Sequence, residues 1–446
     1  MSTAANKQNF IVFFTDQQRW DTVGTYGNPL GLTPNLDEIA RRGTMFQRAF
    51  TPQPLCAPAR SVMQTGRYPT ATGCFRNGIP LPKHAPTIGR TFSDAGYATA
   101  YIGKWHLASG DPVPRDEQAG YQYWLAASEL EWTSHPYDTN VFDSDGNRSW
   151  LPGYRTDALV DAAIRYIDRA VRVEDEPFFL FLSLLEPHHQ NDVDAYLCPP
   201  GYERYAGDWM PTDLAALQGT TPLHLPGYLG MVKRIDEGVG RLVDALRSLN
   251  VLDSTNLLYT TDHGCHFRTR NAEYKRSCHE ASIRIPMLAQ GPYFDARGVV
   301  QQMVSLLDVP TMLCDAAGLQ LEGAVGGVLG SRSHHNQQNH VVRQSDAISD
   351  DDGLLIQLSE AGIGRALRTN RWKYGVLAGT DDGEATGCAG NYVESHLYDL
   401  DADPAELTNL VDDSRYEAVR QQLRSELMAR MRRNGEPECQ IVSEYL

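Results

Sequence analysis

The sequence predicts an α/β fold in which helices flank a mostly parallel sheet, followed by a smaller α+β subdomain at the C-terminus. Two observations lead to this prediction. Several short runs are largely apolar, as the central strands of a parallel sheet are, because such strands are covered on both faces. Segments with helical periodicity separate these runs, and strands that alternate with helices are typical of a helix-flanked sheet.

Each expected element follows from its own pattern. The runs that predict central strands are Phe10–Phe14, Ala98–Ile102, Phe178–Leu185 and Asn256–Thr261. Apolar residues recur at helical spacing in the segments between and after them, which predicts helices over Asn35–Arg42, Pro58–Thr65, Thr87–Ala95, Asp157–Val171, Leu229–Leu249 and Ser305–Ala317.

The composition changes between residues 327 and 352, where Gly, Ser, His, Asn, Gln and Asp dominate and hydrophobic periodicity is weak. This predicts a connecting loop. Beyond it, Leu354–Leu358 and Gly364–Leu377 have the pattern of antiparallel strands, and Tyr416–Arg432 has that of a terminal helix. We therefore expect a main α/β domain over residues 1–345 and a C-terminal α+β subdomain over residues 346–446.

The charge balance and the shortness of the apolar runs exclude several classes of protein. The 446 residues carry a formal net charge of −16 and contain no run of Lys and Arg with interleaved aromatics, which argues against nucleic-acid binding. The apolar runs are far shorter than the ~20 residues of a membrane span, so we expect no membrane contact. No signal-peptide pattern precedes Phe10, which predicts a cytoplasmic location, or a periplasmic one if a leader was removed. The oligomeric state stays open.

Polar residues follow the expected central strands at the point where each strand ends. They include carboxylates, an amide, imidazoles and a lysine: Asp16 and Gln17, Lys104 and His106, Glu186, His188 and His189, and Asp262 and His263. Each of them alone is as easily a turn or capping residue. Because the carboxyl ends of parallel strands share one edge of the sheet, we expect these side chains to meet there. Such a set suits a divalent cation and an oxyanion.

Cys56 lies in the segment Pro54–Ser61, at the expected start of a helix. Pro58 suits the first turn, Gly66 ends the pattern, and Arg60 lies one turn beyond Cys56. A thiol at a helix N-terminus meets positive potential, which lowers its pKa and stabilises an oxyanion formed there. The alternative is a small buried cysteine beside a capping arginine. All eight cysteines are scattered without a CxxC pair, which argues against a disulfide scaffold or structural zinc.

These motifs resemble those of a known family. Cys56–Arg60 followed by Thr65–Arg67 is similar to the maturation signature of type I, formylglycine-dependent sulfatases of the alkaline phosphatase superfamily. Further segments that resemble the family are spread over almost the whole chain: Thr15–Gln18, Thr33–Asp37, Gly96–His106, Glu186–His188, Thr261–Gly264, Lys275, Ile283–Pro286, Asp308–Thr311, Leu397–Leu400, Asp403–Pro404 and Asn409–Leu410.

The resemblance implies that a separate maturation enzyme oxidises Cys56 to formylglycine (3-oxoalanine). The hydrate of this aldehyde, bound at a metal ion, would attack the sulfur of a sulfate ester in line, and the alcohol would leave. Loss of sulfate would then regenerate the aldehyde. A geminal diol suits this chemistry because its second hydroxyl can expel the bound sulfate, which a serine or a thiol cannot do. Arg60 and Lys104 would stabilise the oxygens of the hydrate.

The same resemblance implies roles for three further residues. His106 would be the base that helps the covalent intermediate to collapse. His188 and Lys275 would bind the sulfate group and assist the leaving oxygen. His189 is the alternative to His188, because the two are adjacent.

The metal site that the resemblance implies consists of Asp16, Gln17, Cys56, Asp262 and His263. One divalent ion is expected, Ca²⁺ by the mostly oxygen ligand set, with Mg²⁺ or Mn²⁺ as alternatives because of the imidazole. Many family members have Asp-Asp and Asp-Asn where this chain has Asp-Gln and Asp-His. The latter pairs are also similar to relatives that hydrolyse phosphonate monoesters and phosphodiesters with the same formylglycine.

We therefore expect a sulfatase that hydrolyses a sulfate ester, with a small sulfated saccharide as substrate. The first alternative is a formylglycine-dependent phosphonate monoester or phosphodiester hydrolase. A second is a binding protein in which Cys56 stays a thiol, and a third is catalysis by that thiol. Asn271–Arg276 and His279–Glu280 are candidates to line the pocket, and His266, Arg268 and Arg270 to touch an acidic sugar, although all of them fit an ordinary polar loop equally well.

Overall fold

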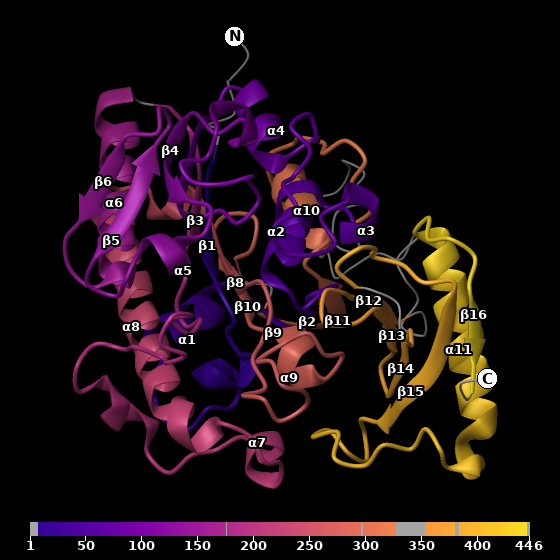
Figure 1. The fold of residues 1–446 in the computed structure, drawn as a ribbon. Helices are drawn as coiled ribbons and strands as arrows, with labels where there is room; N and C mark the ends of the chain where they lie inside the picture. The colour runs from indigo at the N-terminus through magenta and orange to yellow at the C-terminus, as the bar shows by residue number, and fades with distance from the viewer. Residues whose placement is uncertain (1–7, 175, 296–297, 327–352, 380–382, 444–446) are drawn as a thin grey trace.

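The computed structural model describes residues 8–174, 176–295, 298–326, 353–379 and 383–443, which form a large and a small sheet with their helices (Figure 1). In space, the large sheet has the order β11-β2-β10-β8-β1-β7-β3-β4-β5-β6, and β9 pairs with β2. Its strands are β1 (Asn9–Thr15), β2 (Thr44–Phe50), β3 (Ala98–Lys104), β4 (Tyr123–Ala127), β5 (Thr139–Asp143), β6 (Arg148–Leu151), β7 (Phe178–Ser183), β8 (Thr255–Thr261), β9 (Arg284–Ile285), β10 (Met287–Gln290) and β11 (Gly298–Ser305).

The centre of the large sheet is parallel. β8, β1, β7, β3 and β4 run in the same direction, whereas β10 on one side and β5 and β6 on the other are antiparallel to their neighbours. All seven residues of β1 are buried. Because successive side chains of a strand point to opposite faces, Phe10, Val12 and Phe14 join one core, and Ile11 and Phe13 join the other.

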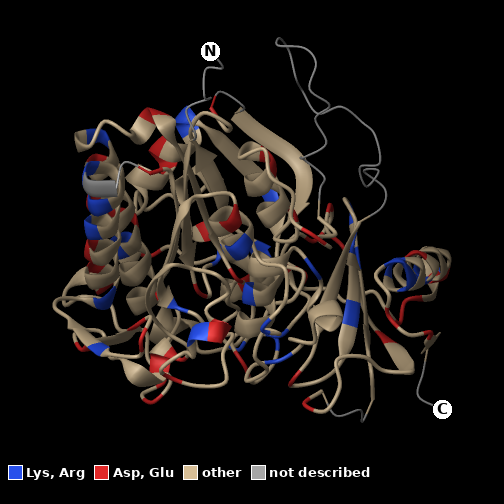
Figure 2. Cartoon of the chain, turned by 90° about the horizontal axis from the view of Figure 1, so that it is seen from above, with Lys and Arg blue, Asp and Glu red and all other residues tan. Residues whose placement is uncertain are grey.

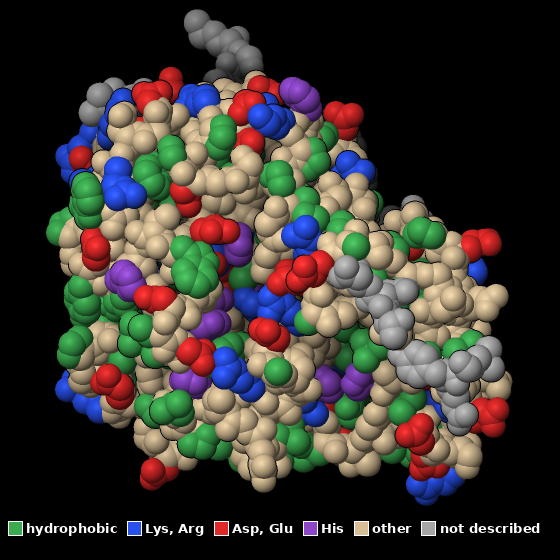
Figure 3. Space-filling view, in the orientation of Figure 1, with side chains coloured by type: hydrophobic (Ala, Val, Ile, Leu, Met, Phe, Trp, Pro, Cys, Tyr) green, Lys and Arg blue, Asp and Glu red, His purple; other side chains and the backbone are tan. Residues whose placement is uncertain are grey.

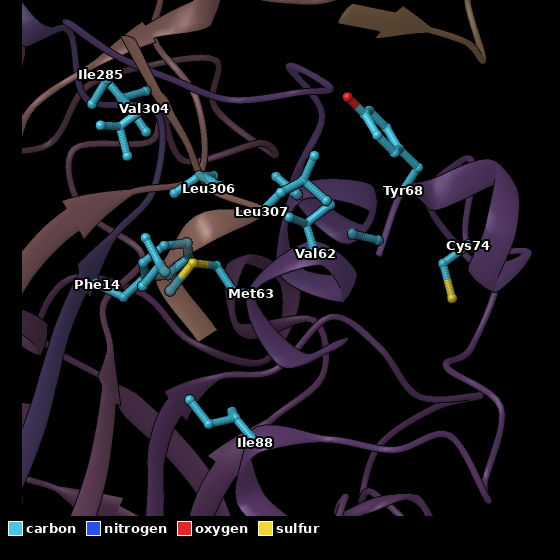
Figure 4. Packing of buried hydrophobic residues seen from close by; sticks show 14 of the residues in the cluster. Phe14, Val62, Met63, Tyr68, Cys74, Ile88, Ile285, Val304, Leu306 and Leu307 are labelled. Atoms are coloured by element: carbon cyan, nitrogen blue, oxygen red, sulfur yellow. The ribbon is translucent and has the colours of Figure 1, made fainter. Parts of the chain in front are cut away.

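Helices cover both faces of this sheet. Apolar side chains of α2, α4 and α10 belong to the first core, and those of α1, α6 and α8 belong to the second. Figure 4 shows part of the first core, in which the side chain of Met63 of α2 extends toward Phe14 of β1. The helices of the described residues are α1 (Pro34–Arg42), α2 (Cys56–Thr65), α3 (Pro69–Thr72), α4 (Ile88–Asp94), α5 (Leu130–Thr133), α6 (Arg155–Arg169), α7 (Thr212–Ala216), α8 (Thr221–Ser248), α9 (Glu280–Ile283), α10 (Asp308–Ala316) and α11 (Glu417–Arg433).

The small sheet is built from the C-terminal part of the chain in the order β12-β13-β14-β15-β16. Its strands are β12 (Leu354–Leu358), β13 (Gly364–Arg368), β14 (Trp372–Leu377), β15 (Asn391–Asp399) and β16 (Gln440–Val442). In Figures 1 and 2, α11 lies on the side of this sheet that faces away from the large sheet. Figure 2 also shows Lys and Arg intermixed with Asp and Glu on the helices that flank the large sheet.

Buried charges join the small sheet to the main body. Glu280 of α9 pairs with Arg368 of β13 at 3.0 Å and with Lys373 of β14 at 2.8 Å. Lys373 Nζ also lies 2.5 Å from Glu406. The expected domain boundary between residues 345 and 346, and the loop expected over residues 327–352, lie outside the described residues, so the division into two domains stays a prediction.

The predicted α/β architecture with a C-terminal α+β region is confirmed, and its four central strands are β1, β3, β7 and β8. The sequence analysis did not predict the strands toward the edges of the large sheet. β6, for example, is short and half-exposed, so it lacks an apolar run. Helix α8 begins at Thr221, well before the expected start at Leu229. Leu225 and Tyr228 pack into a separate hydrophobic core, and the stability gained there exceeds the cost of placing Pro226 inside a helix.

No helix among the described residues combines the length and the apolar character that crossing a membrane requires.

Candidate active site

The carboxyl ends of the central parallel strands bring most of the predicted site residues together. They come from β1, β3, β7 and β8 and from the N-terminus of α2: Asp16, Gln17, Lys104, His188, Asp262, His263 and Cys56. Figure 3 shows a hollow in the face of the molecule seen in Figure 1, where His and basic side chains gather. The predicted convergence at one edge of the sheet is therefore what the fold produces.

Cys56 is at the centre of the site. It is the first residue of α2 and only 2% exposed. Lys275 Nζ donates to Cys56 Sγ at 2.8 Å, and His263 Nε2 lies 3.4 Å from the same sulfur. Burial would raise the pKa of the thiol, but Lys275 and Lys104 outweigh burial and hold it well below its ordinary value. The position therefore stabilises negative charge on whatever side chain it carries.

Asp16 separates the cationic from the metal-binding part of the site. Its Oδ2 accepts from Lys104 Nζ at 2.9 Å and from Arg60 Nη2 at 3.0 Å. Its Oδ1 lies 3.6 Å from Cys56 Sγ and 3.7 Å from His263 Nε2. Burial would raise the pKa of Asp16, yet the neighbouring cations outweigh it and lower the pKa.

The pKa of Asp262 is shifted in the opposite direction to that of Asp16. Burial and the charge of Asp16 raise the pKa of Asp262 to about 6. Two buried carboxylates this close repel each other, and a cation between them relieves both the repulsion and the cost of burial.

The donor atoms of Asp16, Cys56, Asp262 and His263 all lie within 4.8 Å of one another. His263 Nδ1 lies 2.9 Å from the Gly264 carbonyl, which places its proton there and turns the lone pair of Nε2 toward the other donors. Oxygen donors with one imidazole fit a hard or borderline divalent ion, so a metal ion fits these residues.

Gln17 lies next to these donors, because its backbone N–H donates to Asp262 Oδ1 at 2.9 Å. Its backbone adopts a left-handed conformation with φ of 66°. Its Nε2 donates to the Tyr196 hydroxyl at 2.8 Å, while its Oε1 is buried and has no hydrogen-bond partner among the described residues. A buried amide oxygen without a partner is costly unless a cation or another donor reaches it. Gln17 therefore stays a predicted metal ligand.

Lys104 and His106 are joined by a carboxylate that the sequence analysis missed. Glu131 of α5 places Oε1 2.8 Å from Lys104 Nζ and 4.0 Å from His106 Nδ1. Burial would raise the pKa of Glu131, but Lys104 and His106 lower it to about 2. The signal that would have found Glu131 is its position shortly after β4, another parallel strand.

Arg60 has a supporting position. Besides Asp16, its guanidinium donates to the Ser183 hydroxyl at 2.7 Å and to the Lys104 carbonyl at 2.9 Å. It therefore fixes the carboxyl ends of β3 and β7 as well as the carboxylate beside Cys56.

His188, and not His189, faces the centre of the site. Its Nε2 lies 3.2 Å from Lys275 Nζ, and its Nδ1 lies 2.6 Å from the His189 carbonyl. Burial lowers the pKa of His188 and keeps its ring neutral. His189 stacks on the outer side of His188, with ring centroids 4.3 Å apart, and contacts Tyr274 at 4.5 Å.

Four of the residues that are candidates to line the substrate pocket or to touch the sugar make other contacts. His266 and Asn271 hold the backbone of Lys275, because their side chains lie 3.0 Å and 3.1 Å from its carbonyl oxygen. Arg270 and His279 instead turn toward the small sheet region, where they bond the Glu406 carbonyl and the Tyr398 hydroxyl. All four side chains therefore stabilise local structure, and none of these contacts is with Cys56.

Comparison with known proteins identifies the family of the chain. The sulfatase family profile matches residues 8–319. An ulvan-active sulfatase of Formosa agariphila is 26% identical over 451 residues, which cover 96% of this chain and 82% of that protein. A solved structure in complex with its substrate, D-glucosamine-2-N,6-O-disulfate, has a TM-score of 0.75 at 21% identity and covers 96% of this chain and 98% of that one. The phosphonate monoester hydrolase of Agrobacterium radiobacter has a TM-score of 0.70 at 20% identity, with 96% of each chain covered.

These solved structures share the fold of this chain, in which a large central sheet is followed by a smaller C-terminal one. The profile match over most of the chain shows the family: the protein belongs to the sulfatase family and is a sulfuric ester hydrolase.

Proposed function

We propose that this sulfatase hydrolyses the sulfate ester of a small sulfated carbohydrate, and that formylglycine made from Cys56 by a separate maturation enzyme is its nucleophile. One observation carries the mechanism: Cys56 begins α2 inside the signature segment, with Lys275 Nζ 2.8 Å from its sulfur. The carbohydrate is supported by the relative solved with a sulfated glucosamine as its substrate.

The hydrated aldehyde supplies two hydroxyls on one carbon, one to attack sulfur and one to expel the sulfate. The residues of the chain hold charge and move protons around it. Lys104 and Arg60 fix Asp16 beside position 56, and Lys275 Nζ is placed to donate to an oxygen that replaces the sulfur. These cations stabilise the negative charge that develops at the reacting centre.

Proton transfer is assigned to Lys275 and His106. His188 Nε2 lies 3.2 Å from Lys275 Nζ, so this pair holds the sulfate group, and the Lys275 ammonium supplies the proton that reaches the leaving oxygen. His106 Nδ1 lies 4.0 Å from the Glu131 carboxylate, and His106 is assigned as the base that takes the proton from the second hydroxyl. The donors Asp16, Gln17, Asp262 and His263 would hold one divalent ion, whose charge supplies further stabilisation of the anion.

The second candidate function is hydrolysis of a phosphonate monoester or phosphodiester. The pairs Asp16-Gln17 and Asp262-His263 favour it, as does the likeness to a phosphonate monoester hydrolase. Side-by-side kcat/KM values for an aryl sulfate and an aryl phosphonate, measured on the same preparation, separate the two. A higher value for the phosphonate would overturn the sulfatase proposal.

Mass spectrometry of the tryptic peptide Ala49–Arg60 tests the nucleophile directly, with protein made in its native host or together with a maturation enzyme. We expect the mass of the aldehyde at Cys56. An active protein whose Cys56 is an unmodified thiol would refute the formylglycine mechanism and favour thiol catalysis. A thiol in an inactive protein would show that maturation failed.

A further inference from the structure

An ion pair stands beside the candidate active site and takes no part in the chemistry described so far. Arg268 Nη2 lies 3.0 Å from Asp194 Oδ2, and the two side chains are 37% and 45% exposed. Arg268 Nε is buried and has no hydrogen-bond partner among the described residues. The pair is therefore partly open to solvent, and Arg268 keeps one unused donor on its buried side.

One aromatic side chain joins this pair to the centre of the site. The Tyr274 hydroxyl donates to Asp194 Oδ1 at 2.8 Å, and the Arg268 guanidinium lies 4.5 Å from the centroid of the same ring. Tyr274 precedes Lys275, and its ring contacts His189, the neighbour of His188. Two side chains, Tyr274 and His189, thus lie between the pair and His188.

The backbone under both members of the pair is strained. Asp194 and Arg268 adopt left-handed conformations with φ of 48° and 60°, and Phe267 does the same with φ of 49°. Side chains with a Cβ disfavour this region, whereas an ion pair between partly exposed groups returns little stability. The stability that the ion pair contributes therefore does not explain the strained backbone of Asp194 and Arg268. Backbone strain of this kind is found most often at binding and active sites.

We propose that Asp194 and Arg268 determine substrate specificity by binding hydroxyl groups of the sugar ring that carries the sulfate, an inference that rests on the proposed function. A carboxylate accepts hydrogen bonds from hydroxyls and a guanidinium donates to them, so the pair suits two neighbouring hydroxyls of one ring. Because Asp194 already neutralises Arg268, the pair selects a neutral sugar over a uronic acid.

The test compares Asp194→Asn and Arg268→Gln with wild type on two substrates. The first is 4-nitrophenyl sulfate, whose ring has no hydroxyl. The second is the monosaccharide that wild type hydrolyses fastest among glucose, galactose, N-acetylglucosamine and N-acetylgalactosamine bearing one sulfate. We expect each variant to lower the ratio of kcat/KM for the saccharide to kcat/KM for the aryl sulfate at least tenfold, mainly through KM.

Asp161→Asn is the matched control, because Asp161 pairs with Arg241 between α6 and α8 and both side chains are 41% exposed. Asp161→Asn should keep the wild-type ratio within threefold. Thermal melting tests whether each variant is folded. If a variant does not fold, Arg268→Lys is measured in its place.

Equal losses on both substrates would show that the pair only braces the site, and unchanged ratios would show that it touches no substrate. Either outcome overturns the inference. A failure of the proposed function is recognised in the wild-type enzyme, before any variant is made. A wild-type enzyme that hydrolyses an aryl phosphonate but none of the sulfated saccharides would refute both the proposed sulfatase function and the inference about Asp194 and Arg268.

Discussion

Replacing Glu131 by Gln removes one of the two carboxylates that hold Lys104. Glu131 Oε1 lies 2.8 Å from Lys104 Nζ, and its side chain is only 4% exposed. Burial would raise the pKa of Glu131, but Lys104 and His106 lower it from 4.5 to about 2. A difference of about 2.5 in pKa corresponds to roughly 3 kcal/mol. Breaking one side of a buried ion pair costs a similar amount, about 3–5 kcal/mol.

We therefore expect Glu131→Gln to lower the free energy of unfolding at pH 7 by about 3 kcal/mol, measured by urea denaturation. Because the pKa of the folded state lies below that of the unfolded chain, the carboxylate stabilises the protein above pH 4.5, and this contribution is lost as the pH falls toward 2. The gap between wild type and variant should thus stay constant above about pH 5 and narrow below it.

Glu38→Gln is the control for this reasoning. Hydrogen bonds from Arg41 and Arg42 also lower the pKa of Glu38 to about 2, but Glu38 lies on the surface of α1. Solvent screens such a pair, so we expect no measurable change in stability. A Glu131→Gln protein as stable as wild type at pH 7, or a Glu38→Gln protein that loses as much, would refute the argument from burial.

Three further outcomes are expected. Cys56→Ser should abolish turnover in a host that oxidises only cysteine, and near-native activity of that variant would contradict the formylglycine mechanism. His263→Ala should lower the content of divalent metal measured by elemental analysis and remove the rise in melting temperature that added metal gives wild type, since Nε2 lies within 3.7 Å of the Asp16 and Asp262 oxygens; an unchanged metal content would exclude His263 as a ligand. Burial lowers the pKa of His266 to about 4, so the unfolded chain takes up a proton first as the pH falls below 6.5. The free energy of unfolding should then drop by about 2 kcal/mol between pH 7 and pH 5 because of this residue alone, and His266→Gln should be less sensitive over that range in urea denaturation.

The sequence predicts the part of the site that follows the central strands. Asp16, Lys104 and Asp262 come directly after or at the end of a buried parallel strand, and His188 lies in the segment that follows β7. Such strands have a strong local signal, because both of their faces are apolar, and the geometry of a parallel sheet then brings their ends together. Cys56 was predictable for a similar reason, since Pro58 and Gly66 mark the helix that it begins.

The parts that the sequence analysis missed depend on contacts between distant segments. Glu131 lies shortly after β4, but the sequence analysis did not predict this strand, whose first residue is only half-buried, so the position of Glu131 at a strand end was not recognised. Asp194 lies in a long segment without regular structure, and it pairs with Arg268 from a distant segment, with Tyr274 in contact with both. Long-range packing of this kind leaves no periodic pattern in the chain.

The charges of the site explain why an acidic protein can bind an anion. Arg60, Lys104 and Lys275 contribute three positive charges around Cys56, and Asp16, Asp262 and Glu131 contribute three negative ones. A divalent ion among the donors of Asp16, Asp262 and His263 turns this balance into two net positive charges in a buried setting. A sulfate ester carries one negative charge, and a second develops on the leaving oxygen, so the charged site matches the transition state better than the substrate. The net charge of −16 describes the outer surface, whereas the field at the sheet edge is set by these few buried groups.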